Sequence, residues 1–305
     1  MISRRCLLLP AFCCASLLLR AQAADPLSEA RRLVESGQLS EAEQRTQLYL
    51  RTHTNSGDGH FLLGYILFKQ QHAEASLAEY TEAAKYRVPG ALDLAAVAGD
   101  YVLLRDYADA DKWFTKAVEW DPGNFQTLYY LARTKYNENR FEEAVAVFQQ
   151  CLKLDPKNIK AEDNLGLSYQ GLGKTDEALT AYQAAISWEA GVTVKDSGPY
   201  IDLGSLLVDN GRSAEAVPYL LEAIRIAPQD VRGHREIGKA YLHLNQLEKA
   251  QAELERSIQL APSNAPTHFV LAQVYRKRGL REKAESETKR YTELSAANSS
   301  PESLQ

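Results

Sequence analysis

The chain has 305 residues, of which 45% are hydrophobic and 25% charged, and its formal charge is −5. This composition is ordinary for a soluble protein and excludes the disordered and collagen-like classes. The excess of acidic residues disfavours a general affinity for nucleic acid, whose phosphates attract basic surfaces.

Residues 1–23 have the pattern of an export signal. Two arginines are followed by an apolar run over residues 6–19 and by the small-x-small tripeptide 21–23, which signal peptidases cleave. The run is shorter than the roughly 20 residues that span a bilayer. We therefore predict cleavage before Ala24, export to the periplasm or the medium, and no transmembrane segment after the signal is removed.

The same segment leaves the export route open. Arg4 and Arg5 fit a twin-arginine signal, and Arg20 just before the cleavage site fits that route too. We favour the general secretory route, because the basic region is short and the apolar run is strongly hydrophobic. Cleavage removes three arginines and no acid, so the formal charge changes from −5 to −8.

One cysteine remains after cleavage. Three of the four cysteines lie within 1–23, and the fourth is Cys151. A single cysteine cannot form an internal disulfide, so the exported protein depends on its core for stability. We interpret Cys151 as a core residue rather than a reactive thiol, because the repeat described next places it at a small-residue position.

A period of 34 residues organises the remainder of the chain. The dipeptide Asp-Pro recurs at 121 and 155, and Ala-Pro recurs at 227 and 261. The period defines eight units, with four additional residues, 193–196, before the sixth. The predicted units are 24–56, 57–90, 91–124, 125–158, 159–192, 197–230, 231–264 and 265–298, followed by a disordered tail, 299–305.

Small residues recur at fixed positions of the unit. The eighth position is always alanine or glycine, the twentieth is alanine or serine, and bulky apolar residues recur at the seventh and twenty-fourth. In a pair of antiparallel helices, small residues allow the two backbones to approach closely. Glycine-containing turns separate the helices, and a proline often follows the second one. The predicted fold class is therefore all-α.

This pattern resembles the tetratricopeptide repeat (TPR) family. The match is clearest at Leu165-Gly166, Tyr169, Ala178, Tyr182 and Ala185 in one unit and at Ile237-Gly238, Tyr241, Ala250, Leu254 and Pro262 in another. The resemblance implies a right-handed α-solenoid of about eight helix-turn-helix units, from 24 to 298. The first and last units depart from the pattern, as end-capping units do.

No pattern in the sequence indicates an enzyme, a cofactor or a metal. The tripeptide 173–175 imitates the end of a phosphate-binding loop, but Ser168 stands where that motif requires glycine. His60, His234 and His268 share the fourth position of their units. We interpret these histidines as packed between helices rather than as metal ligands.

The resemblance implies that the first helices line a concave face that binds an extended peptide or a helix of a partner protein. The second and fourth units place aromatic residues on this face at helical spacing, with small residues of the third unit between them. The predicted cleft has walls of Phe61, Tyr65, Phe68, Tyr129, Tyr130, Arg133 and Tyr136, and a floor of Ala95, Gly99 and Val102. It would hold apolar or aromatic side chains of the partner. Alternatively, these aromatic residues pack against neighbouring first helices.

The later units carry basic residues on the same face. They are Arg232, Arg235, Lys239, Arg276 and Lys277, partly offset by Asp202, Asp209 and Glu236. This patch could bind an acidic or C-terminal carboxylate segment, or it could be a solvated face with internal ion pairs. Asn164 stands where the family bonds a ligand backbone, but the other residues of the chaperone carboxylate clamp are absent.

The predicted function is that of a non-catalytic, exported protein-interaction scaffold. The alternatives are a self-associating structural protein and an accessory subunit of an envelope enzyme, such as a glycosyltransferase on another chain. The acidic charge and the export signal oppose a reader of single-stranded RNA. Two interpretations of the insertion 193–196 stay open, a surface loop and a hinge between two halves of the array.

Overall fold

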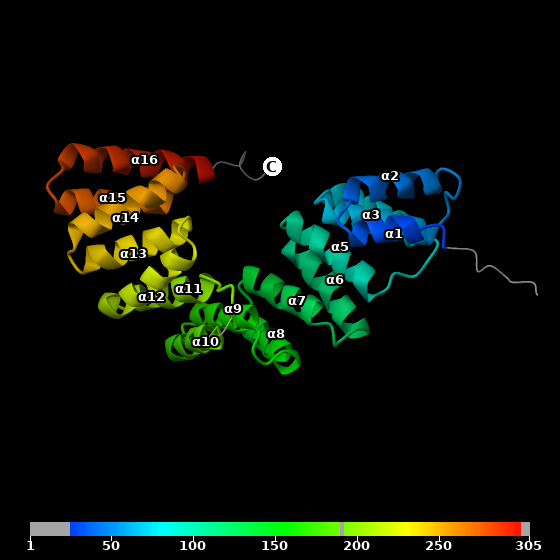
Figure 1. The fold of residues 1–305 in the computed structure, drawn as a ribbon, viewed down its shortest axis with the longest axis horizontal. Coiled ribbons are helices and arrows are strands. Elements are labelled where there is room, and N and C mark those ends of the chain that lie inside the picture. The colour runs from blue at the N-terminus through cyan, green and yellow to red at the C-terminus, as the bar shows by residue number, and fades with distance from the viewer. Residues whose placement is uncertain (1–24, 190–191, 300–305) are drawn as a thin grey trace, which may run out of the picture. The chain divides into compact units, whose positions relative to one another are not determined.

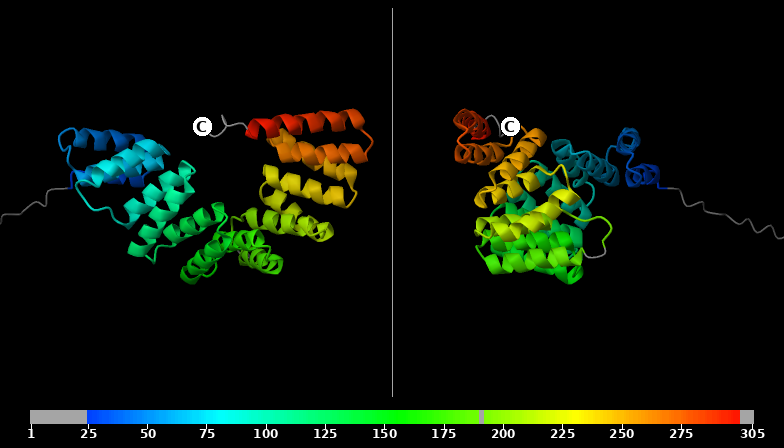
Figure 2. Two further views of the ribbon diagram at one scale, coloured as in Figure 1. Left: turned by 180° about the vertical axis from the view of Figure 1, so that it is seen from behind. Right: turned by 60° about the vertical axis from the view of Figure 1, so that its left-hand side comes forward.

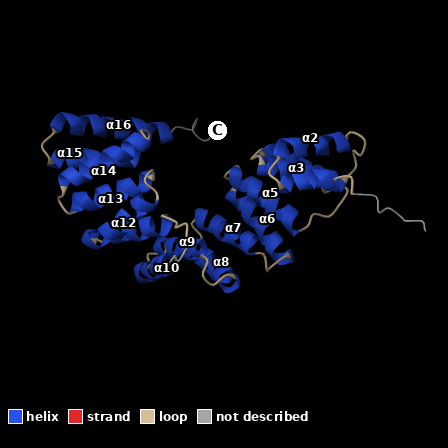
Figure 3. Ribbon diagram, in the orientation of Figure 1, coloured by secondary structure: helices blue, strands red, loops and turns tan. Residues whose placement is uncertain are grey.

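The computed structural model describes residues 25–189 and 192–299, and helices are the only regular elements in this part of the chain (Figures 1 and 3). The chain divides into two compact units, unit 1 up to Val88 and unit 2 from Pro89 onward. Unit 1 contains α1 (Ser28–Glu35), α2 (Leu39–Leu50), α3 (Gly57–Lys69) and α4 (Ala73–Ala83). The predicted signal segment, residues 1–23, lies outside the described residues.

Unit 2 contains the remaining helices. They are α5 (Ala91–Leu103), α6 (Tyr107–Trp120), α7 (Phe125–Asn137), α8 (Phe141–Leu154), α9 (Ile159–Gly171), α10 (Thr175–Trp188), α11 (Gly198–Asp209), α12 (Ser213–Ile226), α13 (Val231–His243), α14 (Leu247–Leu260), α15 (Ala265–Lys277) and α16 (Arg281–Ser299). Consecutive helices pair into hairpins (Figure 2). The all-α prediction of about eight helix-turn-helix repeats is confirmed.

The turn inside each hairpin requires one residue with a positive φ. Glycine occupies this place in four hairpins, with φ between 71° and 77°. In the other four the residue is Gln71, Arg105, Asn139 or Asn245, with φ between 58° and 65°. Only glycine adopts this backbone conformation without a steric penalty, so the turn geometry of the repeat is kept even where the residue is unfavourable.

Close contact between the two helices of a hairpin explains the small residues of the sequence pattern. A methyl group on Gly166 would lie 2.6 Å from the ring of Tyr182, which is fully buried. The Sγ of Cys151 belongs to the core around Phe114 and Phe148, and burial raises the pKa of its thiol to about 12. Cys151 is thus a core residue, as predicted.

The core of unit 2 continues across the four-residue insertion. Tyr182 on α10 belongs to the same buried cluster as Leu203 and Leu207 on α11. Within the loop, the side chain of Glu189 accepts a hydrogen bond from the backbone of Asp196 at 2.7 Å. These contacts favour the surface-loop interpretation, because a hinge here would have to break a shared core. The division into compact units lies between Val88 and Pro89 instead.

The first helices of the hairpins in unit 2 form one face. Contacts join α7 to α9, α9 to α11, α11 to α13 and α13 to α15, while consecutive second helices make no comparable contact in the described part of the unit. The first helices therefore lie on the inner, concave side of unit 2. None of the described helices is both long enough and apolar enough to span a bilayer.

Candidate functional site

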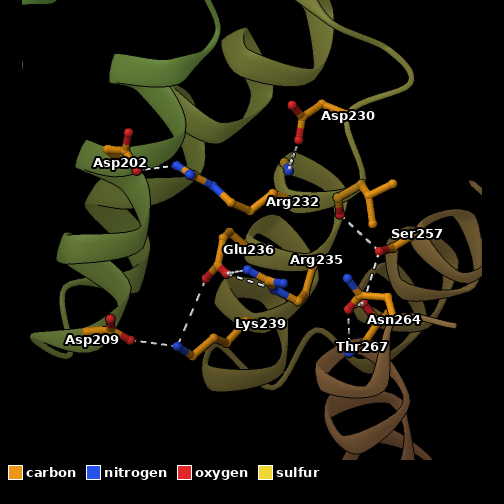
Figure 4. A network of polar contacts seen from close by, with 12 residues as sticks. Asp202, Asp209, Asp230, Arg232, Arg235, Glu236, Lys239, Ser257, Asn264 and Thr267 are labelled. Carbon is orange, nitrogen blue, oxygen red and sulfur yellow. Dashed lines mark hydrogen bonds and ion pairs between the residues drawn. The ribbon is translucent and has the colours of Figure 1, made fainter. Parts of the chain in front are cut away.

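Helices α11 and α13 present a stripe of charged side chains on the face formed by the first helices. On α13 these side chains follow one another at intervals of three or four residues, and on α11 they are seven residues, or two turns, apart. Both spacings place them on one side of the helix. We call this stripe the ion-pair ladder, and it consists of Asp202, Asp209, Arg232, Arg235, Glu236 and Lys239 (Figure 4). Asp202 and Glu236 are more than nine-tenths buried.

Each base of the ion-pair ladder is paired with an acid. The guanidinium of Arg232 donates to the carboxylate of Asp202, and Lys239 Nζ lies 2.6 Å from Asp209 Oδ1. Arg235 Nη2 lies 2.8 Å from Glu236 Oε1. Of the two sequence interpretations, internal ion pairing is therefore the one observed for these three bases.

Two other residues of the predicted basic patch, Arg276 and Lys277, are not paired with acids among the described residues, as the bases of the ion-pair ladder are. Arg276 is exposed and donates to Thr288 Oγ1 at 2.8 Å, and Lys277 is its exposed neighbour at the end of α15. Within the described part of the chain, neither forms an ion pair with a carboxylate. Within the predicted basic patch, the positive charge without an acidic partner thus lies on α15 rather than on α13.

A buried acid on α9 adjoins the ion-pair ladder. Burial raises the pKa of Asp163 well above its usual value, and the negative charges of Asp202 and Asp196 raise it further. Asp163 Oδ1 has no hydrogen-bond partner among the described residues. A buried acid with a raised pKa thus lies beside the pair of Asp202 and Arg232, an arrangement that the sequence did not reveal.

Two cavities meet at the ion-pair ladder. The polar cavity, about 430 Å³, is lined by Tyr136, Gln170, Asp202, Ser205 and Arg232 among others, from α7, α9, α11 and α13. The apolar cavity, about 510 Å³, lies between α13, α15 and α16. Its lining includes Leu242, Pro266, Phe269, Val270 and Tyr291. Arg235 and Glu236 line both cavities, so the two lie next to each other along the face.

In unit 1, the predicted wall residue Phe61 is only 4% exposed. Its ring packs against Tyr80 at a centroid distance of 5.9 Å, and the guanidinium of Arg87 lies 3.9 Å above it. Tyr65 is 38% exposed and packs against Phe68 at 6.3 Å. Phe61 therefore serves the core of unit 1 and offers a partner almost no surface, which corrects its assignment to a binding wall.

In unit 2, the predicted aromatic residues of α7 pack against their neighbours. The ring of Tyr129 meets that of Phe148 edge-on, with the ring centroids 5.9 Å apart. The guanidinium of Arg133 lies 5.9 Å from the centroid of the Tyr129 ring. Tyr130 is 43% exposed. Tyr136 is separated from this group and lines the polar cavity.

The amide of Asn164 is used internally. It donates to Lys160 O at 2.8 Å and to the hydroxyl of Tyr129 at 3.3 Å. These bonds fix the side chain against α7 and occupy its donor group. The cleft predicted between the second and fourth repeats would need residues of both units, and it remains a prediction.

The three histidines at position four form a repeated arrangement that the sequence analysis missed. In each, Nδ1 bonds a glutamate 19 residues later, and Nε2 bonds a backbone carbonyl six residues earlier. We call this arrangement the His–Glu clasp, and its pairs are His60–Glu79 at 2.7 Å, His234–Glu253 at 2.7 Å and His268–Glu287 at 2.5 Å. Both ring nitrogens face acceptors, so only the protonated ring satisfies both bonds. No group of three or more metal-ligating side chains is assembled in the described residues.

Comparison with known families supports the repeat assignment. Residues 201–265 match the family described as tetratricopeptide repeat, and residues 104–185 match subunit 3 of the anaphase-promoting complex, or cyclosome. A solved TPR protein from Parabacteroides merdae aligns with 81% of this chain and 96% of its own at a TM-score of 0.65 and 18% identity. A chain of the APC/C hetero-tetramer Cut9–Hcn1 aligns with 90% of this chain and 54% of its own, at a TM-score of 0.64 and 17% identity. These structural matches show the fold alone.

Curated relatives match over shorter stretches. The probable UDP-N-acetylglucosamine–peptide N-acetylglucosaminyltransferase SPINDLY of Hordeum vulgare is 26% identical over 57% of this chain. The heat shock protein STI1 of Saccharomyces cerevisiae is 32% identical over 28% of this chain. The chain spans only 19% and 15% of the length of these two relatives. Residues 201–265 are thus similar to tetratricopeptide repeats, and the helical hairpins of the described chain have the fold of solved tetratricopeptide repeat proteins.

Proposed function

We propose that this protein is a non-catalytic scaffold that binds an extended segment of a partner protein along the first-helix face of unit 2. The observation that carries this proposal is the pair of adjoining cavities, which share Arg235 and Glu236 and together follow α7 to α16. A polar cavity next to an apolar one suits a peptide, whose backbone needs polar partners and whose side chains need apolar ones.

Blocking the polar cavity tests this function. Ser205→Arg fills the cavity with a long side chain, while Thr180→Arg adds the same side chain on the exposed outer surface of α10. The tagged full chain and both variants are used to capture proteins from an extract of the source organism, followed by quantitative mass spectrometry. We expect Ser205→Arg to lose partners that Thr180→Arg retains, with both variants folded by circular dichroism. Equal capture by the two variants would exclude this face.

We also propose that the protein acts outside the cytoplasm. The support is the signal pattern of residues 1–23, with its cleavage site before Ala24. Expression of the full chain, fractionation of the cells and N-terminal sequencing should give an exported product that begins at Ala24. A product that keeps its first residues and stays in the cytoplasm would contradict the proposal.

A second candidate function is that of an accessory subunit for an enzyme on another chain. It is favoured by the similarity to SPINDLY, a probable glycosyltransferase. The matched region makes up 19% of that protein. In the capture experiment, enrichment of a glycosyltransferase by the wild type and not by Ser205→Arg would support this candidate. Enrichment of partners without catalytic domains would favour the scaffold.

A further inference from the structure

One of the residues that line the apolar cavity, Glu236, has an unused hydrogen-bond acceptor. Glu236 is 5% exposed, and its Oε1 accepts from Arg235, whereas Oε2 has no hydrogen-bond partner among the described residues. Lys239 Nζ lies 4.0 Å from Oε2. A buried carboxylate oxygen without a donor is costly, so this atom is suited to receive one from a ligand.

The floor and the side of the same cavity are apolar. Phe269 is 45% exposed and its ring lies 5.2 Å from that of Tyr291, between α15 and α16. Leu242 and Val270 also belong to the lining. An aromatic ring that stays half-exposed beside a cavity of about 510 Å³ offers contact area for a bulky apolar side chain.

One cation near the cavity, Lys277, lacks an acidic partner among the described residues. Burial lowers the pKa of His243 in its lining, and the nearby cations Lys239 and Lys277 lower it further, so this ring is neutral at pH 7. Lys277 has no carboxylate partner in the described part of the chain. Since the ion pairs of Arg235 and Lys239 leave Lys277 unneutralised, a carboxylate on the ligand would complement this edge.

We propose that the apolar cavity binds an extended acidic segment of a partner protein that carries a bulky apolar side chain. The apolar side chain occupies the cavity against Phe269, a backbone N–H of the segment donates to Glu236 Oε2, and a neighbouring carboxylate pairs with Lys277. This inference rests on the proposed function and specifies the chemistry of its partner.

Selection from a peptide library tests the chemistry directly. A phage-displayed library of random peptides is selected on the immobilised full chain, with Phe269→Ser as the counter-selection. We expect selected peptides to combine Leu, Ile, Phe or Trp with Asp or Glu within three residues. Enrichment of basic apolar peptides that still depend on Phe269 would overturn the inference and leave the proposed function standing. If no peptide is selected, both fail.

A labelled peptide from the selection is then titrated by fluorescence polarisation. Phe269→Ser and Lys277→Glu should each weaken binding by about tenfold or more. Leu221→Ser on α12, which is 43% exposed, and Lys153→Glu on α8 are the matched controls and should leave affinity unchanged. Binding should also weaken as salt is raised from 50 to 500 mM, because the charges on this edge are solvent-accessible.

Two results would overturn the proposal even if peptides bind. Peptides whose affinity is the same for wild type, Phe269→Ser and Lys277→Glu would place the site elsewhere. Sedimentation of the chain as a dimer that Phe269→Ser converts to a monomer would show that a second copy, not a partner segment, fills the cavity.

Discussion

The hairpins α7–α8 and α13–α14 occupy equivalent places in the repeat, but different chemistry holds them together. In α7–α8, position four is Leu128, and it lies with Val147 in a buried apolar cluster. In α13–α14 the same position is His234, whose ring bonds Glu253 and the carbonyl of Pro228. At position four, the same backbone geometry is thus stabilised by apolar packing in one hairpin and by directional hydrogen bonds in the other.

The exposed faces of the two hairpins also differ: aromatic residues cover α7, and charged residues cover α13. On α7, Tyr129 and Arg133 pack on each other and on α8, so the aromatic residues mostly complete the hairpin's own packing. On α13, Arg232 and Lys239 pair with acids on α11, and Glu236 lines two cavities. Cavities thus adjoin the hairpin whose face carries paired charges, whereas on α7 the aromatic side chains pack on one another.

The largest expected effect concerns the hairpin α7–α8, where position four is apolar. Leu128→Ala removes a side chain that is 2% exposed and leaves a cavity, so the free energy of unfolding should fall by about 3 kcal/mol. This loss should be the same at pH 6 and pH 8, because no titratable group takes part. Urea unfolding at both pH values measures it. A loss that changes with pH would show that the contrast between the two hairpins is wrong.

The next effect concerns the ion-pair ladder. Arg232→Met keeps the aliphatic stem but leaves the buried Asp202 without its counter-ion. The carboxylate can take up a proton instead, which limits the expected loss to about 2 kcal/mol. Arg225→Met on α12 breaks the exposed pair with Glu222 and is the control, with an expected loss below about 0.5 kcal/mol. Equal losses of stability in Arg232→Met and Arg225→Met would indicate that the ion-pair ladder stabilises the fold no more than an exposed ion pair does.

A third test compares α9–α10 with α7–α8. Gly166→Ala places a methyl group against the buried ring of Tyr182, whose hydroxyl is held by Gln170 at 2.9 Å. Overpacking should outweigh the better helix propensity of alanine and lower stability by about 1 to 2 kcal/mol. Adding Tyr182→Phe recreates the alanine–phenylalanine pair that Ala132 and Phe148 form in α7–α8. Thermal melts should show partial recovery in the double variant; further loss would mean that the hairpins are not interchangeable.

The sequence predicted the repeat well because the period is expressed in side-chain volume, and the small residues at position eight face bulky ones across the hairpin. The pairing of the charges could not be resolved, because Arg232 and Lys239 can reach either solvent or an acid on α11. Burial of Phe61 was missed for a similar reason, since helical spacing shows a direction but not what covers it. The His–Glu clasps did leave a signal, because Glu stands 19 residues after His in all three units where position four is His.

The smallest expected effect tests the clasp through its pH dependence. Burial lowers the pKa of His60, but the bonds to Glu79 and to the carbonyl of Thr54 outweigh it, so the pKa is raised above 6.5. The protonated ring is the form that bonds both acceptors, so its contribution is fully present below pH 6.5. It is lost as the pH rises through the raised value. Glu79→Gln should therefore cost about 1 kcal/mol at pH 6 and progressively less toward pH 9, measured by urea unfolding. Because the Leu128→Ala loss is constant over this range, a constant loss for Glu79→Gln would mean that the clasp, too, acts by packing rather than by charge.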